Sequence, residues 1–310
     1  MERVREFTYP SADGEHQIYA TVWLPEGEPK AVVQIVHGVA EYVGRYADFA
    51  AFLNERGYVV CGEDHLGHGR TGAQDGKFGY FGKYDGWTLV TADIRTLRQR
   101  MGEEFSGLPY FLLGHSMGSF LTRTYLCRYP GEVSGAILSG TGQESAFLVS
   151  LGKAVASLVG HVRGMDKVSK LVNNLSLGAY NRKFAPNRTS ADWISRDEAV
   201  VDAYLKDPYC TFMPTAGMYR DMLGGLQYIA SRQALSRLDV DTSIGLFSGD
   251  ADPVGGMGKG VEKVYEMYRK AGVRDLKLKL YPGGRHEIIN ETNKQEVYAD
   301  MLAWLEEHMP

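Results

Sequence analysis

A serine, an aspartate and a histidine that could form a nucleophilic triad occur along the chain in the order Ser116, Asp252, His286. Residues 114–118 read Gly-His-Ser-Met-Gly, directly after the apolar run 110–113 and before a helical pattern. A serine on such a sharp turn from strand to helix is raised above the sheet, because the two glycines remove Cβ atoms that would collide there. The alternative is a Gly/Ser turn in which Ser116 only caps the helix.

A serine hydroxyl is a weak nucleophile near neutral pH, so it needs a base that is held in turn by an acid. His286 follows the predicted strand 276–281 and a Pro-Gly-Gly turn, at the carboxyl end of a strand, where catalytic groups gather in parallel sheets. Asp250 and Asp252 both follow an earlier strand and compete for the role of the acid. We favour Asp252, because Pro253 keeps its backbone extended, whereas Asp250 is typical of a turn. A metal site at this Asp-x-Asp is disfavoured, because no further ligand flanks it at the right spacing.

The predicted strand 31–36 ends in a turn that could stabilise negative charge. Residues 37–41 read His-Gly-Val-Ala-Glu. The N–H group of Val39, together with that of Met117, would form an oxyanion hole for the charge that develops on a substrate carbonyl. His37 itself is expected to hold the loop by packing and hydrogen bonding.

A second turn with histidines follows the predicted strand 58–63. Residues 64–69 read Asp-His-Leu-Gly-His-Gly, and its two histidines three residues apart could suggest a metal site. The glycines on both sides of His68 indicate a tight loop instead, so we favour a scaffold role. We predict no metal and no cofactor for this chain.

The elements that must position these residues alternate between strands and helices over most of the chain. Short apolar runs predict strands and longer amphipathic patterns predict helices, an order that implies a mostly parallel sheet with helices on both faces. Residues 141–213 break this rhythm with helical patterns and no convincing strand. We therefore predict one doubly wound α/β core formed by residues 1–140 and 214–310, with a helical cap inserted at 141–213.

Composition describes an ordinary globular chain of 310 residues with a formal net charge of −4. A mildly acidic chain without a Lys/Arg block lacks the electrostatic footprint of a nucleic-acid-binding protein. The three cysteines cannot all pair and form no C-x-x-C, so we expect reduced, buried thiols. Residues 1–6 carry charges where a signal peptide needs an apolar segment, and no stretch reaches the length of a membrane span. The cytoplasm is the expected compartment.

These motifs together resemble the α/β-hydrolase superfamily and, within it, the monoacylglycerol lipase and lysophospholipase branch. They occur in the family's order over nearly the whole chain: His37-Gly38-x-x-Glu41 with Gly44-Arg45-Tyr46, Asp64-His65-x-Gly67-His68-Gly69, residues 114–118, Asp252 in its loop, and His286-Glu287-Ile288. The resemblance implies that Ser116 is the nucleophile, His286 the base and Asp252 the acid, with Val39 and Met117 as oxyanion donors. It also implies that the inserted segment is a lid. The chain departs from the branch at four positions, Val39, Ala40, Tyr42 and Thr71.

The expected activity is the hydrolysis of a carboxylic ester through an acyl-enzyme, with a monoacylglycerol or lysophospholipid as substrate. Phe147, Leu148 and Leu151 begin an apolar stretch that either packs within the cap or roofs an acyl tunnel above Ser116. We expect no stable membrane insertion, although the cap could touch lipid transiently. The oligomeric state is left open by the sequence.

Three other functions remain open on the same fold. A small-ester esterase would lack the tunnel. An aminopeptidase or amidase would need an anionic pocket, which the inserted segment could supply through Asp192, Asp197, Glu198 and Asp202. A catalytically silent receptor would keep the fold without the chemistry.

Overall fold

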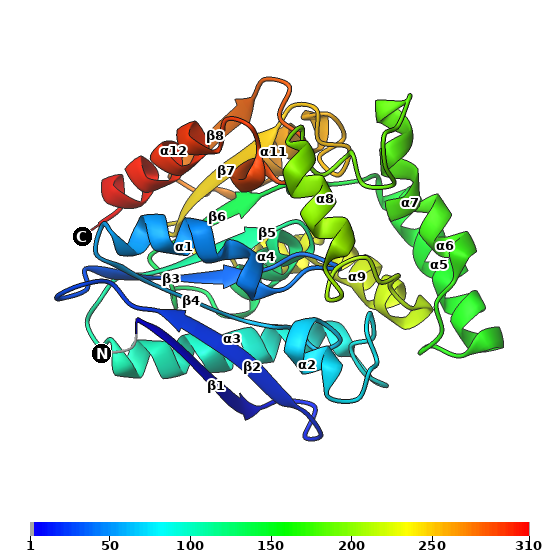
Figure 1. Cartoon of the computed structure of the whole chain (residues 1–310), viewed down its shortest axis with the longest axis horizontal. Coiled ribbons are helices and arrows are strands. Elements are labelled where there is room, and N and C mark those ends of the chain that lie inside the picture. The colour runs from blue at the N-terminus through cyan, green and yellow to red at the C-terminus, as the bar shows by residue number, and fades with distance from the viewer. Residues whose placement is uncertain (1–2, 310) are drawn as a thin grey trace.

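A computed structural model describes residues 3–309 of the chain, which fold around one eight-stranded sheet of order β1-β2-β4-β3-β5-β6-β7-β8 (Figure 1). The strands are β1 (Val4–Pro10), β2 (Gln17–Trp23), β3 (Ala31–Val36), β4 (Tyr58–Glu63), β5 (Tyr110–His115), β6 (Gly135–Ser139), β7 (Ser243–Gly249) and β8 (Leu276–Tyr281). Strand β2 pairs in antiparallel fashion with β1 on one side and with β4 on the other. From β4 to β8 every pairing is parallel, so the carboxyl ends of these strands meet along one edge.

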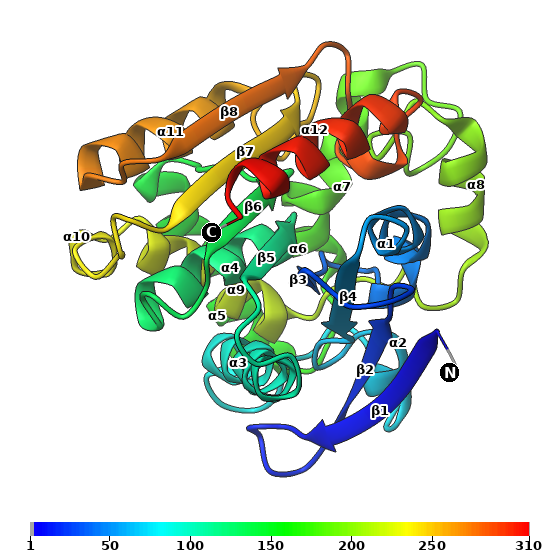
Figure 2. The ribbon, with the colours of Figure 1, turned by 90° about the vertical axis from the view of Figure 1, so that its left-hand side faces the viewer.

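Helices cover both faces of the sheet (Figure 2). They are α1 (Ala47–Asn54), α2 (Gly69–Ala73), α3 (Gly86–Glu104), α4 (Met117–Arg128), α5 (Ala146–Arg163), α6 (Lys170–Leu175), α7 (Leu177–Tyr180), α8 (Glu198–Lys206), α9 (Ala216–Ile229), α10 (Arg232–Leu235), α11 (Lys259–Ala271) and α12 (Lys294–Glu307), with 3-10 turns at Val43–Tyr46, Asn181–Phe184 and Ile288–Asn290. One apolar cluster joins α1 and α12 to the sheet. Another joins α3, α4 and α11 to it. The predicted α/β-hydrolase fold with a mostly parallel sheet is confirmed.

Helix α4 is buried on every side, from Met117 to Cys127. The sheet lies against one face, and α3 and α9 pack against others. An isolated helix would fray, but a helix enclosed in this way is held by the dense packing of its neighbours. The residue just before it, Ser116, is therefore presented from a rigid support.

Helices α5 to α8 lie between β6 and β7 and within the predicted cap range 141–213. Helix α9 packs on α5 on one side and on α4 and α3 on the other, so it joins this helical segment to the sheet domain (Figure 1). The division into core and cap stays a prediction. Met1, Glu2 and Pro310, which belong to the predicted core ranges, lie outside the described residues.

Helix α5 differs from the expectation in its exposure. By length and composition alone it is apolar enough to cross a membrane, with a mean hydropathy of 1.2 over 18 residues, whereas no stretch of that length was predicted from the sequence. One face of α5, with Val149, Ala156 and Gly160, is buried. The helix is therefore amphipathic with an apolar exposed face.

Two further points concern the cysteines and the first strand. Cys61, Cys127 and Cys210 are free and buried, as predicted. Strand β1 was not predicted: its residues alternate between the two faces, and its charged and polar positions mask a period of two.

Candidate active site

The turn at Ser116 joins β5 directly to α4 in a strained backbone. Ser116 has φ 54° and ψ −123°, a positive φ that residues other than glycine rarely adopt. The N–H of Ser116 donates to the carbonyl oxygen of Ser139 at 2.9 Å, which ties the turn to β6. A Cβ on Gly114 would overlap Thr122, and one on Gly118 would overlap the carbonyl of Val36. Glycine is therefore required at both positions, because no larger residue would fit.

His286 pairs with Asp252 at the neighbouring strand ends. The Nδ1 atom of His286 lies 3.0 Å from Oδ2 of Asp252, which is fully buried, and Oδ1 of Asp252 accepts from the N–H of Val254 at 2.9 Å. Asp250 instead accepts from the N–H of Gly283 on the exposed side, at 2.7 Å. Of the two candidate acids, Asp252 alone faces the histidine.

Charge beside His286 makes this imidazole more basic. Burial by itself would lower the pKa of His286, but the nearby carboxylate of Asp252 and its hydrogen bond outweigh burial and raise that pKa above its ordinary value. A more basic imidazole with its Nδ1 held by a carboxylate keeps Nε2 available for a proton.

Ser116 and His286 reach the same edge of the sheet from β5 and β8. The ring of His115 lies 4.6 Å from the ring of His286, centroid to centroid. A Cβ on Gly140 would stand 3.0 Å from both rings, so glycine is needed where they converge. No hydrogen bond joins Ser116 to His286 within residues 3–309, a contact that often tightens only when substrate is bound.

The turn after β3 contacts the turn at Ser116. A Cβ on Gly38 would lie 2.9 Å from Cβ of Ser116, and Ala40 holds a positive φ of 54°. The N–H of Gly38 donates to the carboxylate of Glu41. Within the described residues the N–H groups of Val39 and Met117 donate no hydrogen bond, so both remain free to bind a substrate oxygen.

A buried ion cluster connects the turn 37–41 to the loop that carries His286, here called the histidine loop. The cluster consists of Arg45, Glu41 and Glu287. The guanidinium of Arg45 donates to both oxygens of Glu287, at 2.7 and 2.8 Å, and to Glu41 at 3.1 Å. Burial would raise the pKa of Glu287, but Arg45 outweighs it and lowers this pKa to about 2. Burial keeps the pKa of Glu41 above its ordinary value. One cation therefore holds both the turn 37–41 and the residue next to His286.

The inserted segment also touches the histidine loop. The N–H of His286 donates to the carbonyl of Trp193 at 3.3 Å, and that of Glu287 donates to the carbonyl of Ile194 at 2.7 Å. The indole of Trp193 lies 4.9 Å from the His286 ring, and Arg45 lies over the ring of Tyr204 in α8 at 5.0 Å. Trp193 was not among the predicted site residues, because no motif surrounds it in the sequence.

The histidines after β3 and β4 form a buried stack. The rings of His37 and His65 lie 3.9 Å apart, and the N–H of His65 donates to Nε2 of His37 at 3.1 Å. Burial, reinforced by the neighbouring rings, holds the pKa of His37 well below its ordinary value and lowers that of His68 to about 3. The buried rings bond main-chain atoms and one another, and in this way they support the turn 37–41.

The three residues of α5 predicted as substrate contacts are exposed to solvent. Phe147, Leu148 and Leu151 are 74%, 54% and 51% exposed. They do not line a closed tunnel, and a role in binding substrate stays a prediction for them.

The fold, the strained serine turn and the paired histidine and aspartate define an α/β-hydrolase. Residues 27–293 match the model of a family described as serine aminopeptidase, S33, and the chain belongs to this family. Within the superfamily it belongs to the branch of monoacylglycerol lipases. It is 31% identical over 309 residues to a monoacylglycerol lipase of Mycolicibacterium smegmatis, covering 98% of each chain. It is 27% identical over 308 residues to the human monoglyceride lipase, covering 95% of this chain and 88% of the human one.

A solved structure shares nearly the whole fold. A thermostable carboxyl esterase from Bacillus coagulans, in complex with glycerol, superimposes with a TM-score of 0.92 at 29% identity and covers 99% of both chains. Together with the lipase relatives, this similarity identifies the chain as a carboxylic ester hydrolase.

Proposed function

We propose that this enzyme hydrolyses monoacylglycerols or lysophospholipids through an acyl-enzyme on Ser116. The observation that carries the proposal is the buried Asp252–His286 pair, at 3.0 Å, on the same sheet edge as a serine held at positive φ. A base oriented by a buried acid, beside a raised hydroxyl, is the arrangement that acyl transfer requires.

The reaction proceeds in two halves. Ser116 Oγ attacks the ester carbonyl while Nε2 of His286 takes its proton, and the N–H groups of Val39 and Met117 bind the oxyanion. His286 then protonates the leaving alcohol. In the second half, water that loses its proton to His286 attacks the acyl-enzyme and releases the acid. Asp252 stays ionised and holds the imidazolium in place.

The lipid substrate is supported by the relatives and by the exposed face of α5. The Mycolicibacterium smegmatis and human relatives are a monoacylglycerol lipase and a monoglyceride lipase. We call the face formed by Phe147, Leu148, Leu151, Leu158 and Val162 the α5 face, and each of its side chains is more than half exposed. An amphipathic helix with such a face binds at a lipid–water interface by its apolar side. The proposal therefore includes reversible contact with the surface that holds the substrate, by a protein located in the cytoplasm.

An aminopeptidase activity is disfavoured by what the four acidic residues of the inserted segment do. Asp192 accepts from the N–H groups of Arg188 and Thr189, and Asp197 caps α8. Glu198 and Asp202 lie 3.7 and 2.7 Å from Arg188. Carboxylates engaged in this way do not form a pocket for a free amine.

Replacing Ser116 by alanine tests the chemistry. Alanine adds no volume at the turn, so the fold should survive while kcat falls by about 10⁴ to 10⁶, the scale of triad knockouts. Labelling by a fluorophosphonate probe should disappear as well. Labelling that persists in Ser116→Ala would place the nucleophile elsewhere, and failure of the native enzyme to react would favour a silent receptor.

A substrate series tests the class of substrate. We expect kcat/KM for p-nitrophenyl esters to rise severalfold for every two carbons, since each buried CH₂ contributes about 0.8 kcal/mol. Aminoacyl-nitroanilides should not be cleaved. A steady fall from acetate onward would leave a small-ester esterase, and faster cleavage of the anilides would establish the aminopeptidase.

A further inference from the structure

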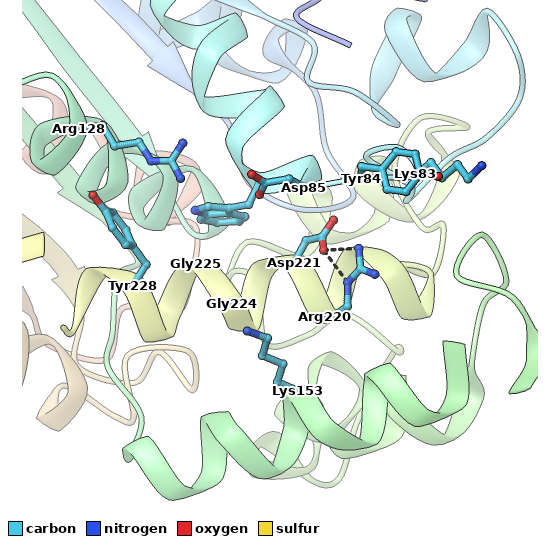
Figure 3. A pocket seen from close by; sticks show the side chains of 11 residues that line it. Lys83, Tyr84, Asp85, Arg128, Lys153, Arg220, Asp221, Gly224, Gly225 and Tyr228 are labelled. Carbon is cyan, nitrogen blue, oxygen red and sulfur yellow. Dashed lines mark hydrogen bonds and ion pairs between the residues drawn. The ribbon is translucent and has the colours of Figure 1, made fainter. Parts of the chain in front are cut away.

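A pocket of about 410 Å³ opens between α5 and α9 of one part of the chain and α3 and α4 of the sheet domain (Figure 3). Its walls include Trp87 in α3, Arg128 at the end of α4, Lys153 in α5, and Gly224 and Tyr228 in α9. We call it the cap–core pocket. Arg128 ends the helix that Ser116 precedes, and at about 1.5 Å per residue the two are roughly 18 Å apart. The pocket is therefore separate from the candidate active site.

Two cations in this pocket have no carboxylate partner within residues 3–309. Arg128 donates to the hydroxyl of Thr88 at 2.8 Å and lies over the ring of Tyr228 at 5.4 Å. Lys153 donates to the side-chain oxygen of Gln227 at 2.9 Å. Both are partly buried and held by neutral groups, so no carboxylate offsets either cation and each has further donors for a ligand.

The remaining charged residues of the pocket are Arg220, Asp221, Lys83 and Asp85. Arg220 donates to Asp221 at 2.8 Å, which neutralises that carboxylate (Figure 3). Lys83 and Asp85 lie beside this pair on the exposed rim. The pocket thus has a net positive charge in a chain whose formal net charge is −4.

Glycines in the middle of α9 keep the pocket open. A helical glycine costs about 1 kcal/mol relative to alanine, so its presence needs a reason. Gly225 has a steric one, because a Cβ there would overlap Trp87. Gly224 has none: its Cβ would meet only the flexible end of Lys153, at 3.4 Å. A side chain at position 224 would extend into the pocket beside Lys153.

We propose that the cap–core pocket binds an oxyanion, a carboxylate or a phosphate, between Arg128 and Lys153. The aromatic side chains of Trp87 and Tyr228 provide an apolar wall for the rest of the ligand, and the indole is fixed by its hydrogen bond to Thr124 at 2.9 Å. Because Lys153 belongs to the inserted helices and Arg128 to the sheet domain, the bound anion links the two parts of the chain.

Calorimetric titration with inorganic phosphate and with octanoate at low ionic strength tests the proposal without using ester hydrolysis. Octanoate that binds as a product at Ser116 is told apart because Arg128→Gln and Lys153→Gln would leave such binding unchanged. We expect binding at millimolar concentration or tighter, weakened about tenfold or more in Arg128→Gln and in Lys153→Gln, the loss typical of a charged hydrogen bond. Lys263→Gln, which removes an exposed cation from α11, is the control and should bind like the native enzyme.

Gly224→Leu separates ligand binding from folding. Leucine is a good helix former, so the melting temperature should not fall, while anion binding should be lost because the side chain fills the pocket. Binding of phosphate alone identifies a phosphomonoester site, and binding of octanoate alone identifies a fatty-acid site. The proposal is overturned if the native enzyme takes up neither anion, or if Arg128→Gln, Lys153→Gln and Gly224→Leu all bind as the native enzyme does.

Discussion

The edge of the sheet where the parallel strands end and the α5 face place their side chains in opposite environments. At the sheet edge Asp252, His286 and Glu287 are almost completely buried, and each has a partner within hydrogen-bond distance. On α5 the large apolar side chains of the α5 face extend into solvent, although burying each would stabilise the protein by about 1.5 to 3 kcal/mol.

This difference separates two requirements of an enzyme that acts on lipid. Chemistry on an ester needs groups fixed in advance, because donors that are already oriented need no reorganisation in the transition state. Contact with a lipid surface needs an apolar area that is left uncovered in the free protein. The same chain therefore has one region with tightly paired charges and another with unpaired apolar surface.

After the loss of the nucleophile, the largest expected effect lies at the acid. Asp252→Asn should lower kcat by about 10⁴, because an amide holds His286 in the wrong tautomer. Asp250→Asn is the matched control, since Asp250 bonds only the turn at Gly283, and it should change kcat far less. Steady-state kinetics on a short p-nitrophenyl ester measures both. An inactive Asp250 variant beside an active Asp252 variant would exchange the two roles.

The ion cluster should contribute mainly to stability. Arg45→Met leaves Glu41 and Glu287 buried without a counter-charge, so the free energy of unfolding should fall by about 3 to 5 kcal/mol. Arg95 pairs with Glu132 at the surface, and Arg95→Met should change the free energy of unfolding by about 1 kcal/mol or less. Urea denaturation compares the two variants. Equal losses would mean that the buried cluster is no more important than a surface pair.

The α5 face should affect only substrate held in a lipid surface. Leu148→Asp and Leu151→Asp, made singly, change exposed positions and should leave hydrolysis of a dissolved butyrate ester unchanged. Hydrolysis of monoolein in phosphatidylcholine vesicles should fall severalfold, because a charge weakens partition into the interface. Loss of activity on both substrates with the fold intact would instead indicate that these residues line an acyl tunnel above Ser116.

The sequence predicted those features whose cause is local. Glycines flanking Ser116, Pro253 after Asp252 and the turn before His286 fix the backbone within a few residues, so type and spacing were sufficient. The contact of Trp193 with His286 depends on two segments more than 90 positions apart, and no spacing rule encodes it. The apolar pattern of α5 identified a helix with a wide apolar face, but not whether that face lies inside or outside, because burial is decided by the neighbouring elements.

The smallest expected effect is a change in the pH dependence of the reaction. Asp252, Glu287 and Glu41 all raise the pKa of His286, and hydrolysis requires this imidazole to be neutral. Glu287, with its pKa near 2, is ionised throughout the working range, so its own titration does not enter. Glu287→Gln removes a negative charge and leaves the positive charge of Arg45, which lowers the pKa of His286. The acidic limb of the kcat/KM profile should therefore move to lower pH, while the same profile for Glu132→Gln, which changes the surface pair with Arg95, should stay in place. A limb that stays in place or moves to higher pH in Glu287→Gln would show that the ion cluster positions the loop without adjusting the base.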